Sequence, residues 1–398
     1  MKDVKNSIKM VLHIIFRKYL RFLQKRMISK NKYVQSIKEH YSNCLKELNY
    51  KTISPKYEIV FKDKDERFLN ELKESYIEKH PSIYIRWISC AKPENIPRLK
   101  IQREVFTCKF NNIKFFGSSG GLVCKDLALM ESAFNEFRFE NCFMVDSKLL
   151  KHKNMKGVFT SIMHYFTSYS HHHWFIDNLP RLYGILKIDE PEINFIIPEE
   201  YNTLQLEILK VFLGNRFNIM KIKFNEVWNL EEYYFSSFSS SDCSGHMPKK
   251  YLDFVGNKMK EAYNIDNRIK NNRIFLSRSE DRWRNLVNEN EVIEILKKYN
   301  FKVIHPKSLS IEKQIKEFDS AEIIIAPHGA ALSNLIFAEE CKVFELFPPY
   351  EFKSHFFMLS KALDFDYYFL KGEKQYDNND FKVNIIEFEE KLKQLIKN

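Results

Sequence analysis

The chain has few glycines for its length, no CxxC cysteine pair and no long apolar run. Three of its ten glycines fall within five positions, at Gly117, Gly120 and Gly121, between two apolar segments. This cluster predicts a hairpin turn, with a ligand-facing loop as the alternative. The seven cysteines form no CxxC pair and are odd in number. They therefore argue for free thiols in a reducing compartment and against a zinc site. No cleavable signal peptide is apparent.

The absence of a long apolar run excludes a spanning helix at the basic N-terminus. The run at residues 10–16 is far shorter than the ~20 residues that cross a bilayer. Residues 1–32 hold ten Lys or Arg against one Asp, so +9 of the net charge of +11 lies there. Apolar residues recur in this segment at helical spacing, at Leu12, Ile15, Phe16, Tyr19, Leu20 and Leu23. We expect residues 1–34 to form a basic amphipathic helix on an anionic membrane surface. The alternative is a helix packed on the protein with a solvated basic face.

Because the rest of the chain carries only +2, a basic groove for nucleic acid spread over the fold is disfavoured. The remaining composition, 44% hydrophobic residues in 398, is sufficient for two packed domains. We expect an N-terminal α/β domain over residues 35–240 and a second over residues 241–380. A serine-rich stretch at residues 236–244 predicts the linker between them. Residues 381–398 form a final helix.

The most informative stretch is residues 323–334. An isoleucine-rich run predicts a strand buried on both faces of a parallel sheet. It breaks at Pro327, turns through Gly329, and opens a helix at Ala330. The first backbone N–H groups of such a helix point outward, and the positive end of the helix dipole lies behind them. An anion, most often a phosphate, suits this position. His328 adds a donor at the mouth, and Asn334 lies one turn into the helix. The plain alternative is an ordinary strand-to-helix turn.

Strands and helices alternate around that junction. We expect strands at residues 273–278, 301–304 and 343–347, with helices at 291–299 and 311–318. This order predicts a doubly wound α/β domain with a parallel sheet. Ligands in such sheets bind at the carboxyl ends of the strands. Arg278 and the turn at residues 328–330 fall there, and with a second arginine they predict a diphosphate clamp. Glu345, at the next strand end, would suit a ribose diol.

These residues resemble those of glycosyltransferase family 61. The similarity is carried by the motifs 276–278, 288–289, 327–330 and 345–346, the positions Arg282, Arg284, Asn334 and Phe337, and an upstream group at 173–174, 177 and 179–181. It extends from about residue 100 to about residue 350 and takes in the glycine-bearing hairpin. The resemblance implies a GT-B fold, in which two Rossmann-like domains face a cleft. It also implies a UDP-linked sugar donor and inversion at the sugar carbon. Asn288 and Glu289 then belong to the donor site. Arg282 fits the family spacing counted from Arg278, and Arg284 fits it counted back from Asn288, so which one contacts phosphate stays open.

An inverting transferase needs a general base for the acceptor hydroxyl. If residues 171–181 form a helix, His173 and Asp177 lie four apart on one face. We expect Asp177 to be the base, with His173 orienting it or exchanging roles. The alternative is a structural Asp177 bonded to His173, with the base elsewhere. Arg181, and His246 after the serine-rich stretch, are further cleft candidates; a loop role for His246 carries equal weight.

No metal or cofactor is expected. The adjacent histidines 171–173 diverge by about 100° on a helix and cannot converge on one ion. Asp364 and Asp366 match a metal-binding DxD motif of another transferase fold. Because they lie between a predicted helix and a predicted strand, we expect them to belong to an ordinary connecting loop.

The sequence therefore predicts a bacterial inverting glycosyltransferase that extends a capsular or other cell-surface glycan from the cytoplasmic face of the inner membrane. Its partners would be a nucleotide-sugar, a glycan or lipid-linked glycan acceptor, and the membrane surface. One alternative is transfer of a pyruvyl or phosphosugar group to the same glycan. Another is a catalytically idle glycan-binding protein on the same fold. By analogy with GT-B enzymes, the last helix would return to the N-terminal domain.

Overall fold

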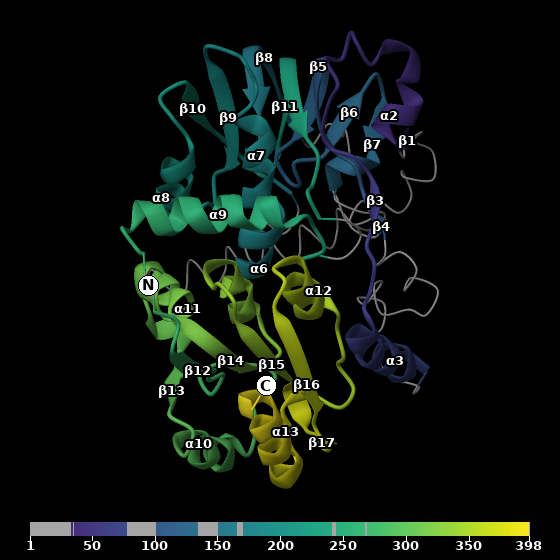
Figure 1. Ribbon diagram of the computed structural model, residues 1–398. Coiled ribbons are helices and arrows are strands. Elements are labelled where there is room, and N and C mark those ends of the chain that lie inside the picture. Colours follow the sequence, from purple (N-terminus) through teal and green to yellow (C-terminus); the bar gives the residue numbers. More distant parts are fainter. Residues whose placement is uncertain are drawn as a thin grey trace. The chain divides into compact units, whose positions relative to one another are not determined.

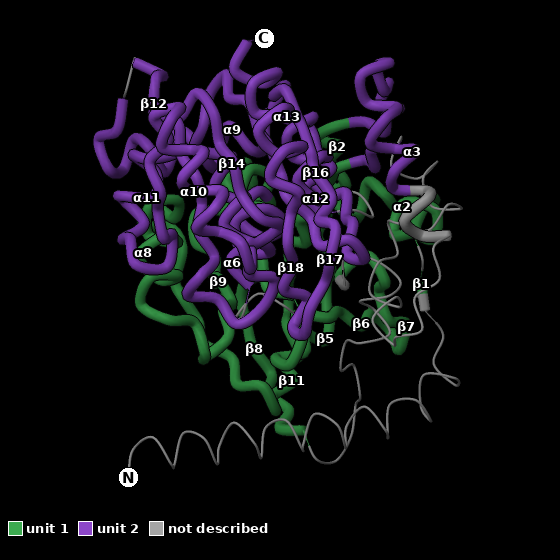
Figure 2. Tube along the Cα trace, turned by 90° about the horizontal axis from the view of Figure 1, so that it is seen from below, with its two compact units in different colours: residues 1–54, 105–169, 181–238 green, residues 55–104, 170–180, 239–398 purple. Residues whose placement is uncertain are grey.

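The computed structural model describes residues 33–34, 36–77, 101–133, 150–164, 170–240, 244–266 and 269–397. All but the last two residues of the predicted basic helix lie outside the described residues. By its contacts the chain divides into two compact units (Figure 2). Unit 1 comprises residues 1–54, 105–169 and 181–238, and unit 2 comprises residues 55–104, 170–180 and 239–398. Residues 55–104 and 170–180, which the sequence division placed in the N-terminal domain, thus belong with unit 2.

Unit 1 is built on a mixed sheet, which has nine strands in the described part of the chain. Its order is β1-β7-β6-β5-β11-β8-β9-β10, with β2 paired to β5. The strands are β1 (Tyr33–Val34), β2 (Lys51–Ser54), β5 (Val105–Phe116), β6 (Leu122–Cys124), β7 (Leu127–Leu129), β8 (Lys151–Thr160), β9 (Ile193–Pro198), β10 (Phe217–Ile222) and β11 (Glu226–Ser236). The helices are α2 (Ile37–His40), α7 (Leu182–Ile185) and α8 (Thr203–Phe212), with short 3₁₀ turns at Ser42–Cys44 and Met130–Ala133. β8, β9, β10 and β11 pair in parallel, whereas β5 and β11 are antiparallel.

The predicted glycine hairpin is confirmed, since β5 and β6 pair antiparallel across residues 117–121. Gly120 has φ 71°, which favours glycine. At Gly117 an added Cβ would lie 2.1 Å from the Lys223 carbonyl oxygen, so this turn needs glycine for close backbone approach.

Unit 2 contains a five-stranded sheet in the order β13-β12-β14-β15-β16, and every pairing is parallel (Figure 1). The strands are β12 (Asn272–Leu276), β13 (Phe301–Ile304), β14 (Ala321–Pro327), β15 (Lys342–Phe347) and β16 (Asp366–Lys371). Counted along the chain, this is the 2-1-3-4-5 order of a doubly wound sheet, whose topological switch point lies between β12 and β14. The predicted parallel α/β organisation of this region is confirmed.

Helices cover both faces of the unit 2 sheet. They are α9 (Lys249–Ala262), α10 (Glu289–Lys297), α11 (Ile311–Asp319), α12 (His355–Ala362), α13 (Ile385–Lys397) and the 3₁₀ helix η10 (Ala330–Phe337). α10 and α13 pack on the face that carries Phe275, Ile323, Ile325 and Phe344. η10 contacts α9, α11 and α12. Phe388, Leu392 and Leu395 of α13 complete this core, so α13 belongs to unit 2.

A long excursion of the chain completes unit 2. α3 (Asp63–Ile77) packs through Phe68, Leu69 and Leu72 against aromatic residues that include Phe352 and Phe357. β3 (Tyr57–Glu58) pairs with β4 (Ile101–Gln102) beside it, and β17 (Lys374–Gln375) pairs with β18 (Phe381–Lys382) after β16. Short 3₁₀ turns occur at Pro306–Ser308 and Asp377–Asn379. None of the described helices is long and apolar enough to cross a membrane.

Candidate active site

A cavity of about 320 Å³ lies in unit 2 at the carboxyl ends of β12, β13 and β14. Arg278 and Arg284 follow β12, His305 and Lys307 follow β13, and the turn after Pro327 follows β14. The side chain of His171 also lines it. The cavity therefore occupies the topological switch point, where parallel sheets bind ligands, and its volume is within the ~300–1,000 Å³ of small-molecule sites.

Arg278 lies directly against the glycine turn. A Cβ added at Gly329 would lie 1.9 Å from Nη1 of Arg278. The backbone of Gly329 is extended, with φ −176°, a conformation that any residue can adopt. Glycine is required here because a side chain would collide with Arg278. Nη2 of Arg278 donates to the Trp283 carbonyl oxygen at 2.9 Å and lies 3.0 Å from Oδ2 of Asp281. Burial, with Arg284 beside it, lowers the pKa of Arg278 to about 10, which still leaves it charged at neutral pH.

Arg284, and not Arg282, joins Arg278 at the cavity. Arg282 is exposed, and its guanidinium carbon lies 5.2 Å from the centre of the Trp283 ring. Arg284 lines the cavity, and its Nη1 donates to Oε1 of Glu351 at 3.3 Å. Glu351 also contacts Lys353 and accepts from Nδ2 of Asn379 at 3.1 Å. Of the two arginines that the spacing left open, Arg284 is therefore the one that lines the cavity.

The hairpin β17–β18 holds the Arg284 loop in place. Arg284 has φ 62°, and its N–H donates to the Asn378 carbonyl oxygen at 3.0 Å. The next N–H, of Asn285, donates to Oδ1 of Asp380 at 2.7 Å. An arginine in the left-handed region is uncommon, and these contacts from residues about 95 positions later stabilise it.

His328 and Glu345 form a buried pair beneath the turn. Nδ1 of His328 bonds Oε1 of Glu345, and Tyr367 donates to Oε2 at 2.5 Å. Burial raises the pKa of Glu345 to about 8. Burial also lowers the pKa of His328 well below its ordinary value, and the nearby charges of Arg284 and Lys353 lower the pKa of His328 further. At neutral pH the pair therefore shares one proton. Glu345, expected to hold a ribose, has no exposed surface, because β15 is flanked by β14 and β16 and the side chains of both neighbours satisfy its carboxyl oxygens.

Asn288 and Glu289 lie at the start of α10 and do not line the cavity. Asn288 exchanges two hydrogen bonds with the backbone of Val383, at 3.0 and 3.2 Å. Glu289 accepts from the Ser277 hydroxyl at 3.0 Å. Asn288 thus joins the start of α10 to the backbone after β18, and Glu289 joins it to the end of β12.

The histidine segment begins a short helix and continues as a π-helical turn. Ser170 caps α6 (His171–His173), and η7 (Trp174–Asn178) follows. Nδ1 of His173 lies 2.6 Å from Oδ2 of Asp177. The other oxygen of Asp177 accepts from the hydroxyls of Ser240 and Ser244, at 3.0 and 2.8 Å. The Asp177 side chain is 0% exposed and that of His173 is 17% exposed. Of the two side chains in this pair, His173 is therefore the one with exposed surface.

The other two histidines attach this segment to η10. Nε2 of His171 lies 2.9 Å from Oδ1 of Asn334. Nδ1 of His172 lies 2.7 Å from the Ser333 hydroxyl, and its Nε2 lies 2.8 Å from that of Ser244. Asn334 also donates to Gln314 of α11 at 2.7 Å. The η10 helix, which follows the glycine turn, and the His173–Asp177 pair thus belong to one hydrogen-bonded assembly within unit 2.

The two further cleft candidates lie elsewhere. Arg181 is buried in unit 1, where Nε donates to the Ser236 carbonyl oxygen at 2.9 Å and the guanidinium stacks 4.3 Å from the Phe238 ring centre. His246 is buried in unit 2, and burial lowers its pKa to about 4. His246 lines a second cavity, on the α3 and β16 side.

Sequence reasoning missed Glu351 and Lys353. Both follow the carboxyl end of β15, so the rule that singled out Arg278 and His328 would have found them. The supporting serines, Ser240, Ser244 and Ser333, carry no signal of this kind, because serine is common in turns and their partners are distant in sequence.

A doubly wound sheet with basic side chains around a cavity at its switch point is typical of a protein that binds a phosphorylated ligand. The model of the family described as Glycosyltransferase 61 matches residues 171–344, which include the histidine segment, the arginine loop and the glycine turn. This match supports the family resemblance and a transferase of the glycosyl-transferring kind. No curated protein matches the chain.

Proposed function

We propose that the protein is an inverting glycosyltransferase that moves a sugar from a UDP-sugar to a glycan acceptor in cell-surface polysaccharide biosynthesis. The observation that carries this proposal is the pairing of Arg278 and Arg284 at the switch-point cavity, within the region that the family model matches. Two guanidinium groups bind the oxygens of a diphosphate in pairs and neutralise its charge as it leaves. Lys353, which shares Glu351 with Arg284, adds a third positive charge beside them.

His173 is the general base of the proposed reaction. Asp177 accepts from Nδ1–H, and this tautomer places the lone pair of the imidazole on Nε2. The acceptor hydroxyl transfers its proton to Nε2 while its oxygen forms a bond to the anomeric carbon of the donor. The bond from that carbon to the phosphate oxygen breaks, and UDP leaves with the electron pair. Asp177 stabilises the imidazolium that forms, as a buried carboxylate does in other His–Asp pairs.

The test is calorimetric titration of the purified protein with UDP, GDP, CMP, CDP and ADP, with and without EDTA. We expect selective binding of UDP that persists in EDTA, because fixed cations hold the diphosphate in this proposal. UDP-sugars would then be screened for transfer to lipid-linked acceptors. If no nucleotide bound, the proposal would fail and a catalytically idle glycan-binding protein would take its place.

Residues 1–32 would bring the enzyme to its acceptor at the cytoplasmic face of the inner membrane. Their nine net positive charges support this part of the proposal, at ~1 kcal/mol for each basic residue near an anionic surface. The full chain should sediment with vesicles that contain phosphatidylglycerol, less so as salt increases, and not with pure phosphatidylcholine vesicles. Equal sedimentation with both kinds of vesicle would contradict a charge-driven contact.

A further inference from the structure

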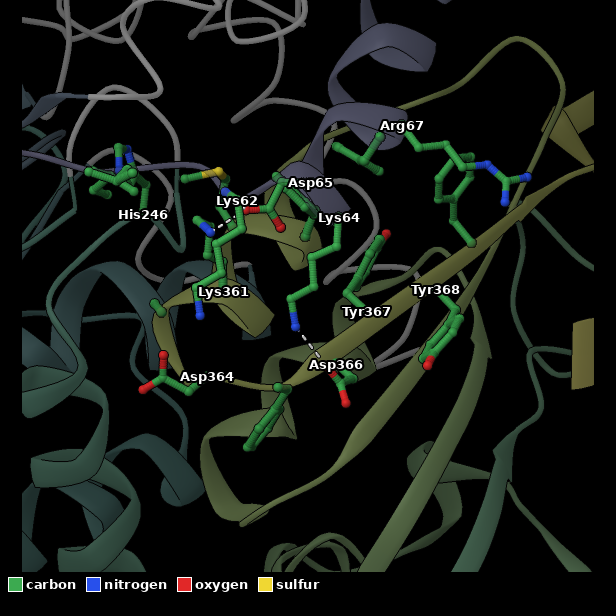
Figure 3. A pocket seen from close by; sticks show the side chains of 18 of the residues that line it. Lys62, Lys64, Asp65, Arg67, His246, Lys361, Asp364, Asp366, Tyr367 and Tyr368 are labelled. Atoms are coloured by element: carbon green, nitrogen blue, oxygen red, sulfur yellow. Dashed lines mark hydrogen bonds and ion pairs between the residues drawn. The ribbon is translucent and has the colours of Figure 1, made fainter. Parts of the chain in front are cut away.

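A second cavity, of about 580 Å³, lies in unit 2 and shares no lining residue with the arginine cavity. Its walls come from residues 57–68, the start of α9, α12, β16 and α13. Figure 3 shows side chains that line it, among them Lys62, Asp364 and Asp366. Its volume also falls in the range of small-molecule sites. Nothing in the proposed donor site or in the proposed transfer step accounts for it.

The cavity is formed by the excursion that carries α3 onto unit 2. Phe68 of α3 stacks on Phe357 of α12, with ring centres 4.1 Å apart, and meets Tyr367 edge to face at 5.5 Å. This packing fixes α3 beside β16, the edge strand of the sheet. Tyr57, just before α3, lines the cavity while 41% exposed, although large aromatic side chains usually bury most of their surface. It supplies an aromatic face that is open to a ligand.

Charged side chains of both signs line the same walls, and some of them form ion pairs with one another. Lys64 lies 2.7 Å from Asp366, and Lys361 contacts Asp65, as Figure 3 shows. In the described part of the chain, Lys62 and Asp364 have no side-chain ion pair, and both are exposed at the cavity. A lysine donor and a carboxylate acceptor are therefore available together with the Tyr57 ring.

This combination decides the class of ligand. A second nucleotide is disfavoured, because the cations of these walls are balanced by carboxylates: Lys64 and Lys361 pair with Asp366 and Asp65, and Lys62 and Arg67 lie with Glu58 and Asp364. A saccharide offers what the walls match: hydroxyl groups that both donate and accept hydrogen bonds, and an apolar ring face of C–H groups that packs on an aromatic ring. We propose that this cavity binds a saccharide segment of the acceptor glycan, at a distance from the sugar that reacts. The inference rests on the proposed function only in taking that saccharide to be the acceptor.

The test uses the full chain on an array of defined oligosaccharides that includes neutral, N-acetylated and uronic acid-containing chains. The variants are Tyr57→Ala, Lys62→Ala and Asp364→Asn; asparagine tolerates the φ of 64° at position 364, so only the charge is removed. Tyr376→Ala is the matched control, because Tyr376 is a 40% exposed tyrosine that lines neither cavity. UDP affinity and the melting temperature are measured for every protein.

We expect the wild type to bind at least one saccharide class. Tyr57→Ala should weaken that binding about ten-fold, and Lys62→Ala and Asp364→Asn several-fold, with UDP affinity and Tyr376→Ala unchanged. The inference is overturned if no saccharide on the array binds, or if binding is the same in all three variants. UDP binding without saccharide binding would therefore reject this cavity and leave the transferase proposal standing. Saccharide binding without UDP binding would reject the transferase and keep the cavity as a glycan site.

Discussion

Gly329 and Arg278 lie so close together that no methyl group fits between them, since a Cβ at position 329 would lie 1.9 Å from Nη1 of the arginine. The extended backbone at Gly329 is open to any residue, so Gly329→Ala acts only through this contact. We expect the guanidinium to move away from the turn, with loss of a charge-assisted contact and roughly ten-fold weaker UDP binding. Calorimetry measures the affinity.

Little change in melting temperature is expected for Gly329→Ala, because the atom that must move is the end of a flexible side chain. Arg278→Ala in the same assay should weaken UDP binding further and abolish turnover. Unchanged UDP affinity in both variants would remove Arg278 from the diphosphate site.

Arg282 and Arg284 form a matched pair of test positions two residues apart. Arg284→Ala removes a cation from the cavity and should weaken UDP about ten- to hundred-fold. Arg282→Ala removes only an exposed stacking contact with Trp283 and should leave the affinity within about two-fold. Titration with UDP and with UMP separates loss of diphosphate contacts from loss of nucleoside contacts. The opposite ranking of the two variants would return Arg282 to the site.

His173→Ala and Asp177→Asn should both reduce turnover while the affinity for UDP stays constant. Positioned general bases contribute about 10²–10⁴-fold, and we expect the full loss in His173→Ala. Asp177→Asn keeps the shape of the side chain but no longer favours the required tautomer, so its loss should lie in the same range. Turnover of a UDP-sugar at saturating donor is the measurement, with the exposed His40→Ala as control. If only Asp177→Asn lost activity, the base would be the carboxylate.

The stability of the protein should fall between pH 6.5 and pH 8. The pKa of Glu345 is about 8 in the folded protein and about 4.5 when exposed, so in this window the folded state holds a proton that the unfolded state has lost. Its stabilising contribution is complete below pH 4.5 and decreases as the pH rises through 8. The lowered pKa values of His328 and His246 act in the opposite direction, but only below about pH 6.5.

Denaturant unfolding at pH 6.5 and pH 8 measures this effect, which amounts to at most about 2 kcal/mol at 1.36 kcal/mol per pH unit. Glu345→Gln removes the titrating group, and its stability should change much less between the two pH values. A wild type whose stability is constant or increases across the window would mean that Glu345 is ionised at neutral pH.

Much of unit 2 could be predicted from local sequence pattern. The strand at residues 301–304 and the helices α10, α11 and α13 follow from apolar periodicity, which acts within a few residues. The glycine turn after β14 followed in the same way, because Pro327 ends the strand and Gly329 precedes the next helical segment. The rule that parallel strands bind ligands at their carboxyl ends then gave the correct edge of the sheet for Arg278 and the turn.

Local sequence pattern therefore gave the class of fold in this region and several of the residues around the switch point. Tertiary structure decided which of them face the cavity. Arg284 is chosen over Arg282 by a hairpin about 95 residues later, and Glu345 is removed from the cavity by Tyr367 on the neighbouring strand. Asp177 is enclosed by two serines more than 60 residues away, which leaves the exposed role to His173. Side-chain access depends on contacts between segments that are distant along the chain, and no local periodicity records those contacts.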